Sequence, residues 1–588
     1  MGSGIYSLGT SAMFAAQAML DTTAHNISNA NTPGYSRQQV ELATEGGLYT
    51  GSGFFGRGVR VATVTRSTNE FLVKEANLNT AAAASDQTRL DKLSQLENVI
   101  PTGENGLGYA SSQLLNAFVD VANQPQDVSA RQVVLSRAQE WVSRVNTAGN
   151  QIEELQAGVV SDMGHTIDQI NGYTKQIASL NQDIAKYTGV GHTANDLLDQ
   201  RDLLVNKLNK LVQVNTVEAE DGSLSVFMGG GQLLVLSNQA QTLALVRDPS
   251  DASKGRVALV TNGTSRILDN DQIVGGALEG LQQFQDEDLE KTRSNLNTFV
   301  AQFSEKVNKQ QTVGWYANPD QTSTTKGLFG PKIFNGKLQS DGTESFLATS
   351  VSLSSIKPNQ IAASLPYIIN TGTLDGATGK YSQNTSTAQV GSFAVVHEGG
   401  LPPGLYPPVT VSFEASATAT SGLLYKFTDS YGNNYASGDW TAGTAFSDTS
   451  SGIDTFQITL AGVPAAGDSF TIENVTSPQS NNGNALAMLA LRDNAFMTLD
   501  GGLTNATITD TYSQMIGDLG VLVQNGKTAA GISSTLETQA TQTLASTSGV
   551  NLDEEASRLI QYQQSYQAAA KVLQVAQKVF ETLLNTTA

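Results

Sequence analysis

"HNISNANTPGYSRQQ", residues 25–39, is the stretch that most strongly constrains how this chain folds. It follows an apolar segment rich in alanine and methionine, and residues 1–32 are predicted to be a helix that ends in this stretch. Asparagine and the Pro33-Gly34 pair oppose the continuation of a helix, so a defined turn is predicted here. Such a turn can be a linker, an enzyme loop or a joint between protein subunits, and the rest of the sequence has to distinguish these.

The composition argues against several classes of site and partner. The chain has 588 residues and no cysteine, which excludes disulfides, thiolate metal sites and thiol catalysis. Its four histidines lie far apart in sequence and show no metal-binding spacing. The net charge of −20 argues against nucleic acid and anionic membranes as partners, because both attract a concentrated positive surface. The first basic residue is Arg37, so no secretory signal is expected, and the apolar stretch at 13–20 is too short to span a membrane.

An apolar seam with helical spacing runs along the last part of the sequence. Its positions follow one another in steps of three and four residues, which predicts a helix of about 30 residues, roughly 45 Å long. The seam consists of Leu559, Tyr562, Tyr566, Ala569, Leu573, Ala576, Phe580 and Leu583. A similar seam runs from Met163 to Tyr187. Because the first segment of the chain offers mainly small apolar residues, its helix cannot cover the C-terminal seam completely.

β-structure is predicted in the middle of the chain. A small β-rich piece is expected near 212–275, where "GSLSVFMGGGQLLVLS" (222–237) has the pattern of a hairpin. From about 330 to 485, short alternating runs are separated by glycine, asparagine, aspartate and serine, which predicts a sandwich or barrel-like domain.

The predicted fold class is therefore α+β and multidomain. The N- and C-terminal helices are expected to pair as a coiled-coil or helical-bundle stem, with β-rich outer domains inserted between them. The predicted parts are an inner-core helix and turn (1–40), a helical stem domain that contains the small β-rich piece (41–330), a β-rich outer domain (331–485), return helices of the stem (486–550) and a C-terminal inner-core helix (551–588).

Several motifs resemble chemical sites but lack the context that such sites need. "GSGFFG" (51–56) is followed by strand alternation rather than by a helix, so a flexible turn is favoured over a dinucleotide-binding loop. "NGKTAAG" (525–531) lacks the glycine that a phosphate-binding loop requires five residues before its Gly-Lys-Thr. No catalytic, metal-binding or cofactor-binding residue and no cofactor are predicted.

Two groups of charged residues are interpreted as structural. In "NLDEEASRL" (551–559), an acid/base pair or cation site is the alternative, but Asn551 or Asp553 as a helix N-cap with acids in the first turn is favoured. In "NDLLDQRDLLVNKL" (195–208), a buried or interfacial cluster that packs the stem is predicted. Its members are Asp199, Arg201 and Asp202.

A family resemblance rests on two motifs at opposite ends of the sequence. "NISNANTPGYSRQ" (26–38) resembles the signature of bacterial flagellar rod, hook and hook-associated proteins. "TSGVNLDEEASRLIQYQQSYQAAAKVLQVAQKVFETLLN" (547–585) is similar to the C-terminal signature of the same axial family. The internal "NDLLDQRDLLVNKLNKLV" (195–212) resembles a segment of its hook-associated members. The resemblance covers about residues 1–315 and 485–588 and leaves the β-rich insert unmatched.

The resemblance implies a structural protein of the bacterial flagellum that polymerises as an adaptor at the junction of hook and filament. It also implies an extracellular location after export through the flagellar type III apparatus without a cleaved signal peptide. The implied partners are further copies of the protein in a ring or helical assembly, the hook protein, a second junction protein next to the filament, and an export chaperone.

Two site expectations follow from the resemblance and the sequence together. A rigid corner is expected to turn the chain from the inner helix to the outer domain, with Tyr35 anchored against a neighbour; its residues are Asn26, Asn29, Asn31, Pro33, Gly34 and Tyr35. The C-terminal seam is expected to bind neighbouring subunits and, before export, the chaperone. Both termini are expected to be disordered or weakly helical until the protein polymerises.

Three alternatives remain open from the sequence. The protein could be another axial component, such as the hook protein or the second junction protein. A wall-cleaving enzyme within 330–485 is a further class, although no recognisable catalytic pair occurs there. The β-rich domain could also have an adhesin-like role, since it is rich in threonine, serine and asparagine.

Overall fold

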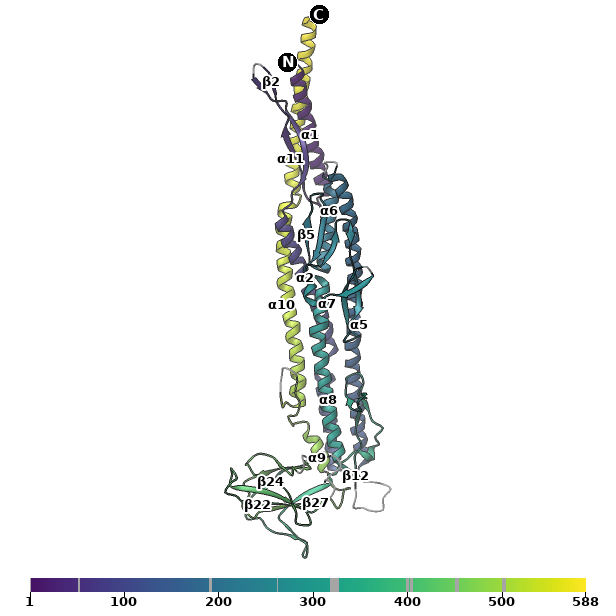
Figure 1. Cartoon of the computed structure of the whole chain (residues 1–588), viewed down its shortest axis with the longest axis vertical. Coiled ribbons are helices and arrows are strands. Elements are labelled where there is room, and N and C mark those ends of the chain that lie inside the picture. The colour runs from purple at the N-terminus through teal and green to yellow at the C-terminus, as the bar shows by residue number, and fades with distance from the viewer. Residues whose placement is uncertain are drawn as a thin grey trace. The chain divides into compact units, whose positions relative to one another are not determined.

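The computed structural model describes residues 2–50, 53–189, 193–261, 263–317, 327–397, 401, 406–449, 454–499 and 504–587 (Figure 1). The protein divides into two compact units. The first unit contains residues 1–96, 155–289 and 521–588, and the second contains residues 97–154 and 290–520. These limits differ from the predicted domain limits at 330 and 485, and the predicted domains stay a prediction.

The first unit is built mainly from long helices. Three of these helices also contain residues that belong to the second unit. The helices are α1 (Gly2–Asn29), α2 (Glu70–Val99), α5 (Val128–Thr188), α6 (Asn195–Leu211), α7 (Gly276–Gln283), a π-helix (Phe284–Leu289), α10 (Ile508–Ser548) and α11 (Leu552–Thr587), with a short 3₁₀ turn at Asn270–Gln272. The predicted helices at both ends of the chain are thereby confirmed.

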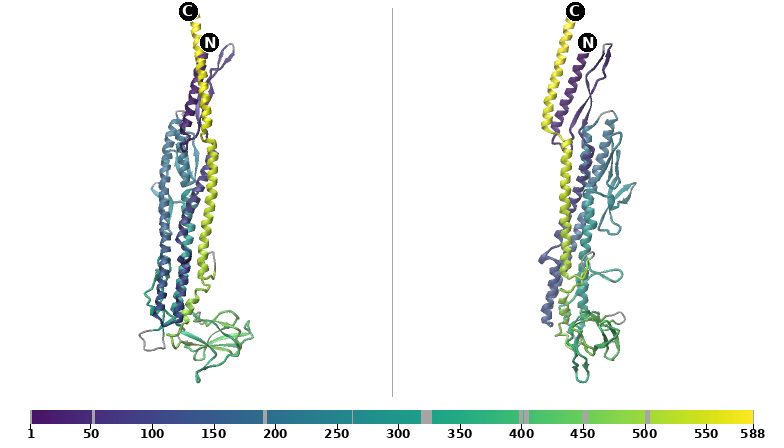
Figure 2. Two further views of the ribbon diagram at one scale, coloured as in Figure 1. Left: turned by 180° about the vertical axis from the view of Figure 1, so that it is seen from behind. Right: turned by 90° about the vertical axis from the view of Figure 1, so that its left-hand side faces the viewer.

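Helices α1 and α11 pack side by side and run antiparallel, as both views of Figure 2 show. The hydroxyl of Tyr6 accepts a hydrogen bond from Gln577, and Gly9 faces Leu573. A hairpin of β1 (Gln38–Thr44) and β4 (Val59–Arg66) lies against α1, and β2 (Leu48–Thr50) and β3 (Gly53–Phe55) form a shorter hairpin.

The small β-rich piece predicted near 212–275 is present in the first unit. It contains a four-stranded antiparallel sheet and a three-stranded one, and the predicted hairpin at 222–237 contains two of the paired strands. The strands are β5 (Val214–Glu218), β6 (Leu224–Met228), β7 (Leu233–Leu236), β8 (Gln239–Ala240), β9 (Thr242–Arg247), β10 (Gly255–Thr261) and β11 (Thr264–Ile267).

The second unit combines helices with most of the strands of the protein. Its helices include α3 (Leu107–Asn116), α4 (Phe118–Asn123), α8 (Glu290–Val313) and α9 (Gly483–Ala490), with 3₁₀ turns at Gly103–Asn105 and Pro358–Gln360. Trp141 is fully buried here, with its ring 4.7 Å from Phe303 and 4.8 Å from Phe334. Its indole N–H donates to Ser111 Oγ at 2.8 Å, so the one polar atom of the ring is satisfied.

Short paired strands precede the β-rich domain in the second unit. They are β12 (Trp315–Ala317), β13 (Gly327–Phe329), β14 (Phe334–Asn335), β15 (Lys337–Leu338), β16 (Glu344–Ser345) and β17 (Ser352–Leu353). The domain itself contains β18 (Tyr367–Thr371), β19 (Leu374–Asp375), β20 (Lys380–Tyr381), β21 (Gln389–Val395), β22 (Val409–Ala415), β23 (Leu423–Thr428), β24 (Asn434–Asp439), β25 (Phe446–Ser447), β26 (Phe456–Ala461) and β27 (Ser469–Asn474).

Two antiparallel sheets of this domain share one hydrophobic core. The larger has the order β18-β27-β22-β23-β24, and the smaller has the order β21-β26-β25. Along β22, Val409, Val411 and Phe413 are buried while the residues between them are not, as expected for a strand with one face in a core. Phe427 and Phe470 join the same core. The predicted fold class, with helical ends and a β-rich sandwich between them, is confirmed.

Buried or half-buried amide groups of asparagine and glutamine fix several strands and loops onto neighbouring elements. In each case the amide oxygen accepts from the backbone N–H, and the amide NH₂ donates to the backbone carbonyl oxygen, of one residue. The pairs are Asn171 with Leu243, Asn181 with Leu224, Gln285 with Gly255, Asn308 with Phe334, and Asn384 with Ser469. An amide can satisfy buried backbone groups without the cost of burying a charge, which gives a structural role to neutral polar residues in a sequence with only 15% charged residues.

Candidate functional site

The backbone makes a tight corner directly after α1. The N–H of Thr32 bonds to the C=O of Asn29 at 2.9 Å, and the N–H of Tyr35 bonds to the C=O of Thr32 at 3.2 Å. Gly34 has a φ of +81°, and a Cβ atom placed on it would lie 2.9 Å from the Cβ of Leu203. Glycine is therefore required at this position for both its backbone conformation and the close approach of α6.

Asn26 lies at the centre of the corner and uses both ends of its side chain. Its Oδ1 accepts from the N–H of Gln38 at 2.9 Å and from the hydroxyl of Tyr35 at 2.7 Å. Its Nδ2 donates to the C=O of Gln38 at 2.9 Å and to Glu555 Oε2 at 2.9 Å. Asn26 is only 1% exposed, and all four hydrogen bonds that an amide can make are formed. This one residue holds both limbs of the corner and the start of α11.

Glu555 connects the corner to the other end of the sequence. Its carboxylate is 1% exposed, and Oε1 accepts from Nε of Arg37 at 2.9 Å. The backbone N–H of Arg37 bonds to the C=O of Ser548, the last residue of α10. Glu555, Asn26 and Arg37 together are called the Glu555 network below. The network brings together residues that are separated by more than 500 positions in the sequence.

Tyr35 is anchored within its own subunit. Its hydroxyl donates to Asn26, and its ring meets the ring of His25 edge-on at 5.5 Å. Burial, followed by the negative charges of Asp199, Asp196 and Glu555, raises the pKa of the Tyr35 hydroxyl, so it remains a hydrogen-bond donor at physiological pH. Within one subunit the hydroxyl already donates to Asn26, and the anchoring of Tyr35 against a neighbouring subunit stays a prediction.

The predicted cluster on α6 exists, but with a different cation. Arg66 of β4 donates to Asp199 at 2.8 Å and to Asp202 at 2.7 Å, and Asp199 also accepts the N–H of Ser36 at 3.0 Å. The two aspartates are three residues apart, so they share one face of the helix, whereas Arg201 lies on another.

Arg201 is instead buried against the small β-rich piece. It donates to the C=O of Gly222 at 2.6 Å and to Asn181 Oδ1 at 3.3 Å, and it forms a longer ion pair with Glu218. The guanidinium of Arg201 hydrogen-bonds to neither Asp199 nor Asp202 and binds the backbone of the β5–β6 turn, although the charge of Asp202 still acts on it.

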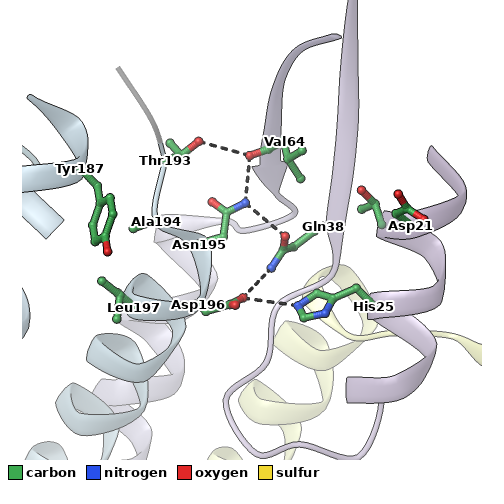
Figure 3. A pocket seen from close by; sticks show the side chains of 11 residues that line it. Asp21, His25, Gln38, Val64, Tyr187, Thr193, Ala194, Asn195, Asp196 and Leu197 are labelled. Atoms are coloured by element: carbon green, nitrogen blue, oxygen red, sulfur yellow. Dashed lines mark hydrogen bonds and ion pairs between the residues drawn. The ribbon is translucent and has the colours of Figure 1, made fainter. Parts of the chain in front are cut away.

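A groove of about 620 Å³ opens beside the corner, between α1, β4 and the start of α6 (Figure 3). A series of hydrogen bonds lines it. Asn195 donates to the C=O of Val64 and to Gln38 Oε1, Gln38 donates to Asp196, and His25 lies 3.5 Å from the same carboxylate. No group of three or more histidine, aspartate or glutamate side chains that could hold a metal ion occurs among the described residues. These contacts position elements; they do not arrange a reactive group.

The remaining predicted corner residues lie at its surface. Asn29 donates to the C=O of His25 at 3.0 Å, one helical turn earlier, and thereby caps the end of α1. Asn31 and Pro33 are exposed. Asn551 caps α11 as predicted, because its Oδ1 accepts from the N–H groups of Asp553 and Glu554.

The C-terminal seam faces α1 only in part. Ala569 and Ala576 are buried, and Leu559, Tyr562, Tyr566 and Leu573 are half-buried. Phe580 is 56% exposed, and the side chain of Leu583 lies outside those that the structure describes.

The sequence interpretation missed a second apolar stripe on α11. Val572, Val575 and Val579 are 41%, 62% and 46% exposed, and they follow one another at steps of three and four residues. This outer valine stripe lies roughly a third of a turn away from the seam that faces α1. The 3–4 spacing of the valines was itself the signal that could have revealed it.

The two motifs that resemble nucleotide-binding loops do not form such loops among the described residues. Residues 51 and 52 of "GSGFFG" lie outside them, while Gly53–Phe55 form β3, which leads to β4 rather than to a helix. "NGKTAAG" lies inside α10. In the part of the protein that the structure describes, no helix is long and apolar enough to cross a membrane.

Comparison with known families finds three matches along the sequence. Residues 93–329 match the family described as flagellar hook-associated protein FlgK helical domain. Residues 8–35, which include most of the corner, match the family flagella basal body rod protein. Residues 541–586 match the family flagellar basal body rod FlgEFG protein C-terminal.

Similar proteins span nearly the whole sequence. Flagellar hook-associated protein 1 of Salmonella typhimurium is 29% identical over 589 residues, which cover 99% of this chain and 100% of that protein. The protein of the same name from Escherichia coli K12 is 28% identical over 99% of this chain and 100% of its own length. The solved structure of the flagellar hook junction protein FlgK from Burkholderia pseudomallei has the same fold, with a TM-score of 0.60 at 24% identity, over 80% of this chain and 99% of that one.

Proposed function

We propose that this protein polymerises at the hook–filament junction through the outer valine stripe of α11. The protein belongs to the flagellar hook-associated protein 1 family and is a structural protein of that junction. Neighbouring copies are proposed to cover this stripe and the exposed part of the C-terminal seam, so that α1 and α11 of many copies form the inner wall of a short tube. The hook protein on one side and a second junction protein on the other are the proposed neighbours of this tube.

The observation that carries the proposal is the large apolar area left open on α11. Val572, Val575, Val579 and Phe580 are each more than 40% exposed within one subunit. Burial of one such side chain is worth about 1.5–3 kcal/mol, so a helix that exposes four of them gains substantially when another apolar surface covers it. A stripe with steps of three and four residues fits the packing of helix against helix.

The corner has a proposed role in this assembly. Both limbs of the corner are hydrogen-bonded to Asn26, and α11 is bonded to the same side chain. A fixed corner would hold the rest of the subunit at a defined orientation relative to the inner helices. A joint between two tubes of different stiffness requires such a defined orientation. Asp199, Asp202 and Arg66 support the corner from α6 and β4.

We further propose how the protein reaches its location. It is exported through the flagellar type III route without a cleaved signal peptide, and a chaperone covers the apolar C-terminal face before export. Both terminal helices are disordered or weakly helical in the free subunit and become ordered on polymerisation. No enzymatic activity is assigned to the protein, because its relatives are structural proteins of the flagellum.

The assembly proposal is tested by placing a charge on the outer valine stripe. The double variant Val572→Asp and Val575→Asp should abolish polymerisation of the purified protein in sedimentation assays, and cells that carry it should fail to retain filaments. The matched control is Gln574→Asp, because Gln574 is exposed on the same helix but lies on neither apolar stripe. Normal polymerisation and filament retention by the double variant would overturn the proposal.

A further inference from the structure

The pairing of α1 with α11 has an unresolved register when only its apolar pattern is considered. The C-terminal seam repeats every seven residues, so a shift of α11 by seven positions presents the same kind of face to α1. Such a shift moves the helix by about 10 Å along its axis. The apolar seam alone therefore defines which face of α11 is used, but not which residues meet.

The shape of the interface provides little additional discrimination. Among the described side chains of α1 and α11, the buried ones are Ala15, Ala16, Thr23, Asn26, Glu555, Ala569 and Ala576. Alanines allow helices to approach closely, but they do not interlock as large side chains do. One steric fit exists near the far end, where a Cβ atom on Gly9 would lie 2.9 Å from the Cδ2 and Cγ atoms of Leu573.

We propose that Glu555, held by Asn26 and Arg37, is the residue that determines the register of the α1–α11 pair. Glu555 is the buried carboxylate of α11, and both of its oxygens are bonded to groups at the end of α1 and in the corner. A buried polar group whose partners exist in one alignment only is an established way to select a single register in helical pairs.

A shifted pair would lose these bonds without replacement. If α11 moved by seven residues, so that Tyr562 took the place of Glu555 opposite Asn26, the carboxylate would be about 10 Å from Arg37 and Asn26. The Nδ2 group of Asn26 and the guanidinium of Arg37 would then both lose an acceptor. A shift of seven residues in the opposite direction would place position 548 opposite Asn26. This shift is opposed by the break between α10 and α11, because α10 ends at that position. The native register is consequently the one in which Asn26 makes all four of its hydrogen bonds and both carboxylate oxygens of Glu555 are bonded.

The register has a consequence for the surface of the subunit. Because the corner fixes the C-terminal end of α1, the alignment at Glu555 also fixes how far the outer valine stripe extends along α1. This inference concerns contacts within one subunit, and it does not depend on the proposed function.

The absence of cysteine from the sequence allows a direct test. The native register is reported by Tyr6→Cys with Gln577→Cys, because these two side chains touch in the structure. A shift of seven residues is reported by Tyr6→Cys with Leu584→Cys. Each pair is treated with a short bismaleimide in the full-length protein, as monomer and as polymer, and the ratio of native to shifted cross-linking is taken from the state in which the amides of α1 and α11 are protected from hydrogen exchange.

In the otherwise unchanged protein, the native pair should cross-link at least ten times more than the shifted pair. Glu555→Ala should lower this ratio at least tenfold, and Glu555→Gln, which keeps one acceptor oxygen, should lower it less. The matched control is Asp553→Ala in the same first turn of α11, since that side chain is exposed; it should leave the ratio unchanged.

Two results would overturn the inference. One is a ratio for Glu555→Ala equal to that of the Asp553→Ala control. The other is a loss of cross-linking at both pairs in Glu555→Ala while Glu555→Gln keeps the unchanged ratio, because Glu555 would then support the fold without selecting a register. Neither criterion uses the amount of polymer that forms or the outer valine stripe, so a failure of the assembly proposal is distinguishable from a failure of this one.

Discussion

In the β-rich domain five phenylalanines are buried, whereas the described side chains buried in α1 and α11 are alanines, one threonine and the polar residues Asn26 and Glu555. The domain obtains its stability from large apolar side chains packed between two sheets. The terminal pair obtains order from a hydrogen-bonded network and leaves much of its apolar surface open. The comparison indicates that the domain is complete within one subunit, while the terminal pair is built to be completed by others.

The largest expected effect is a loss of packing in the β-rich domain. Phe427→Ala removes a fully buried ring from the shared core and should cost about 3–5 kcal/mol of unfolding free energy. Hydrogen exchange of peptides from residues 409–474 would measure this loss.

The same variant sharpens the comparison between the two regions. If the terminal pair is independent of the domain core, peptides from residues 5–29 and 552–580 should exchange as in the unchanged protein. Tyr431→Ala, which removes a side chain that is 74% exposed, is the control and should change exchange by less than about 0.5 kcal/mol. Equal loss of protection in the terminal helices after Phe427→Ala would break the comparison.

The β-rich domain should also respond to pH through one buried acid whose pKa is raised. Burial raises the pKa of Asp448 from 3.8 to about 6, despite the N–H groups of Thr455 and Phe456 that bond to its Oδ1. A raised pKa means that the folded domain binds the proton more tightly than the unfolded state does. The stabilisation of the folded domain by the protonated form of Asp448 is therefore fully present below pH 3.8. It is lost as the pH rises through 6, by about 2–3 kcal/mol in total.

Asp448→Asn should remove this dependence, because its Oδ1 can still accept from both N–H groups. Unfolding of the two proteins at about pH 4.5 and pH 7 provides the measurement, and the variant should be the more stable protein at pH 7. Asp468 serves as an internal reference, since its pKa is lowered to about 2 and it stays ionised over this range. Parallel pH profiles for the variant and the unchanged protein would contradict the assignment.

The sequence predicted those parts of the molecule that depend on neighbouring residues. The turn at Pro33 and Gly34, the N-cap at Asn551 and the alternation along β22 all arise from local backbone chemistry or from the period of a strand. The structure has each of them. A local rule is sufficient where the partner lies within a few positions.

The parts that the sequence did not predict depend on partners far away. The sequence around Glu555 indicates only that it is one of three acids that favour a helix start, and nothing near it indicates that Asn26 and Arg37 bind it. Arg201 was assigned to the aspartates beside it in sequence, whereas the helix turns it toward Gly222. A single sequence gives the face of a helix but not the element that packs there.

The next effect in size concerns the polar side of the comparison. Asn26→Leu keeps the number and branching of the side-chain heavy atoms but removes four hydrogen bonds, and it leaves Oε2 of Glu555 without its donor. The expected cost is about 1–3 kcal/mol of local stability in the corner, because a buried group then lacks its partner. Hydrogen exchange of the amides at 35–40 measures this cost.

Asn31→Leu provides the matched control for Asn26→Leu. Asn31 belongs to the same turn but is exposed, so its replacement should change the local stability by less than about 0.5 kcal/mol. Equal exchange in both variants would mean that the terminal pair does not rely on its buried polar network, and the contrast with the apolar core of the β-rich domain would disappear.

The smallest expected effect tests whether the corner is held by its backbone as well as by side chains. Gly34→Ala places a Cβ atom 2.9 Å from the Cβ of Leu203 and forces an alanine to adopt a φ of +81°, which together should cost about 1–2 kcal/mol. Gly46→Ala is the control, because nothing lies within 4 Å of its added Cβ and its φ is not positive. Leu203→Ala keeps the clashing Cβ and removes only the side-chain atoms at 3.3 and 3.4 Å, so it should relieve little of the cost. Full recovery in the double variant Gly34→Ala with Leu203→Ala would instead show that packing against α6, not the left-handed conformation, is what requires glycine at this corner.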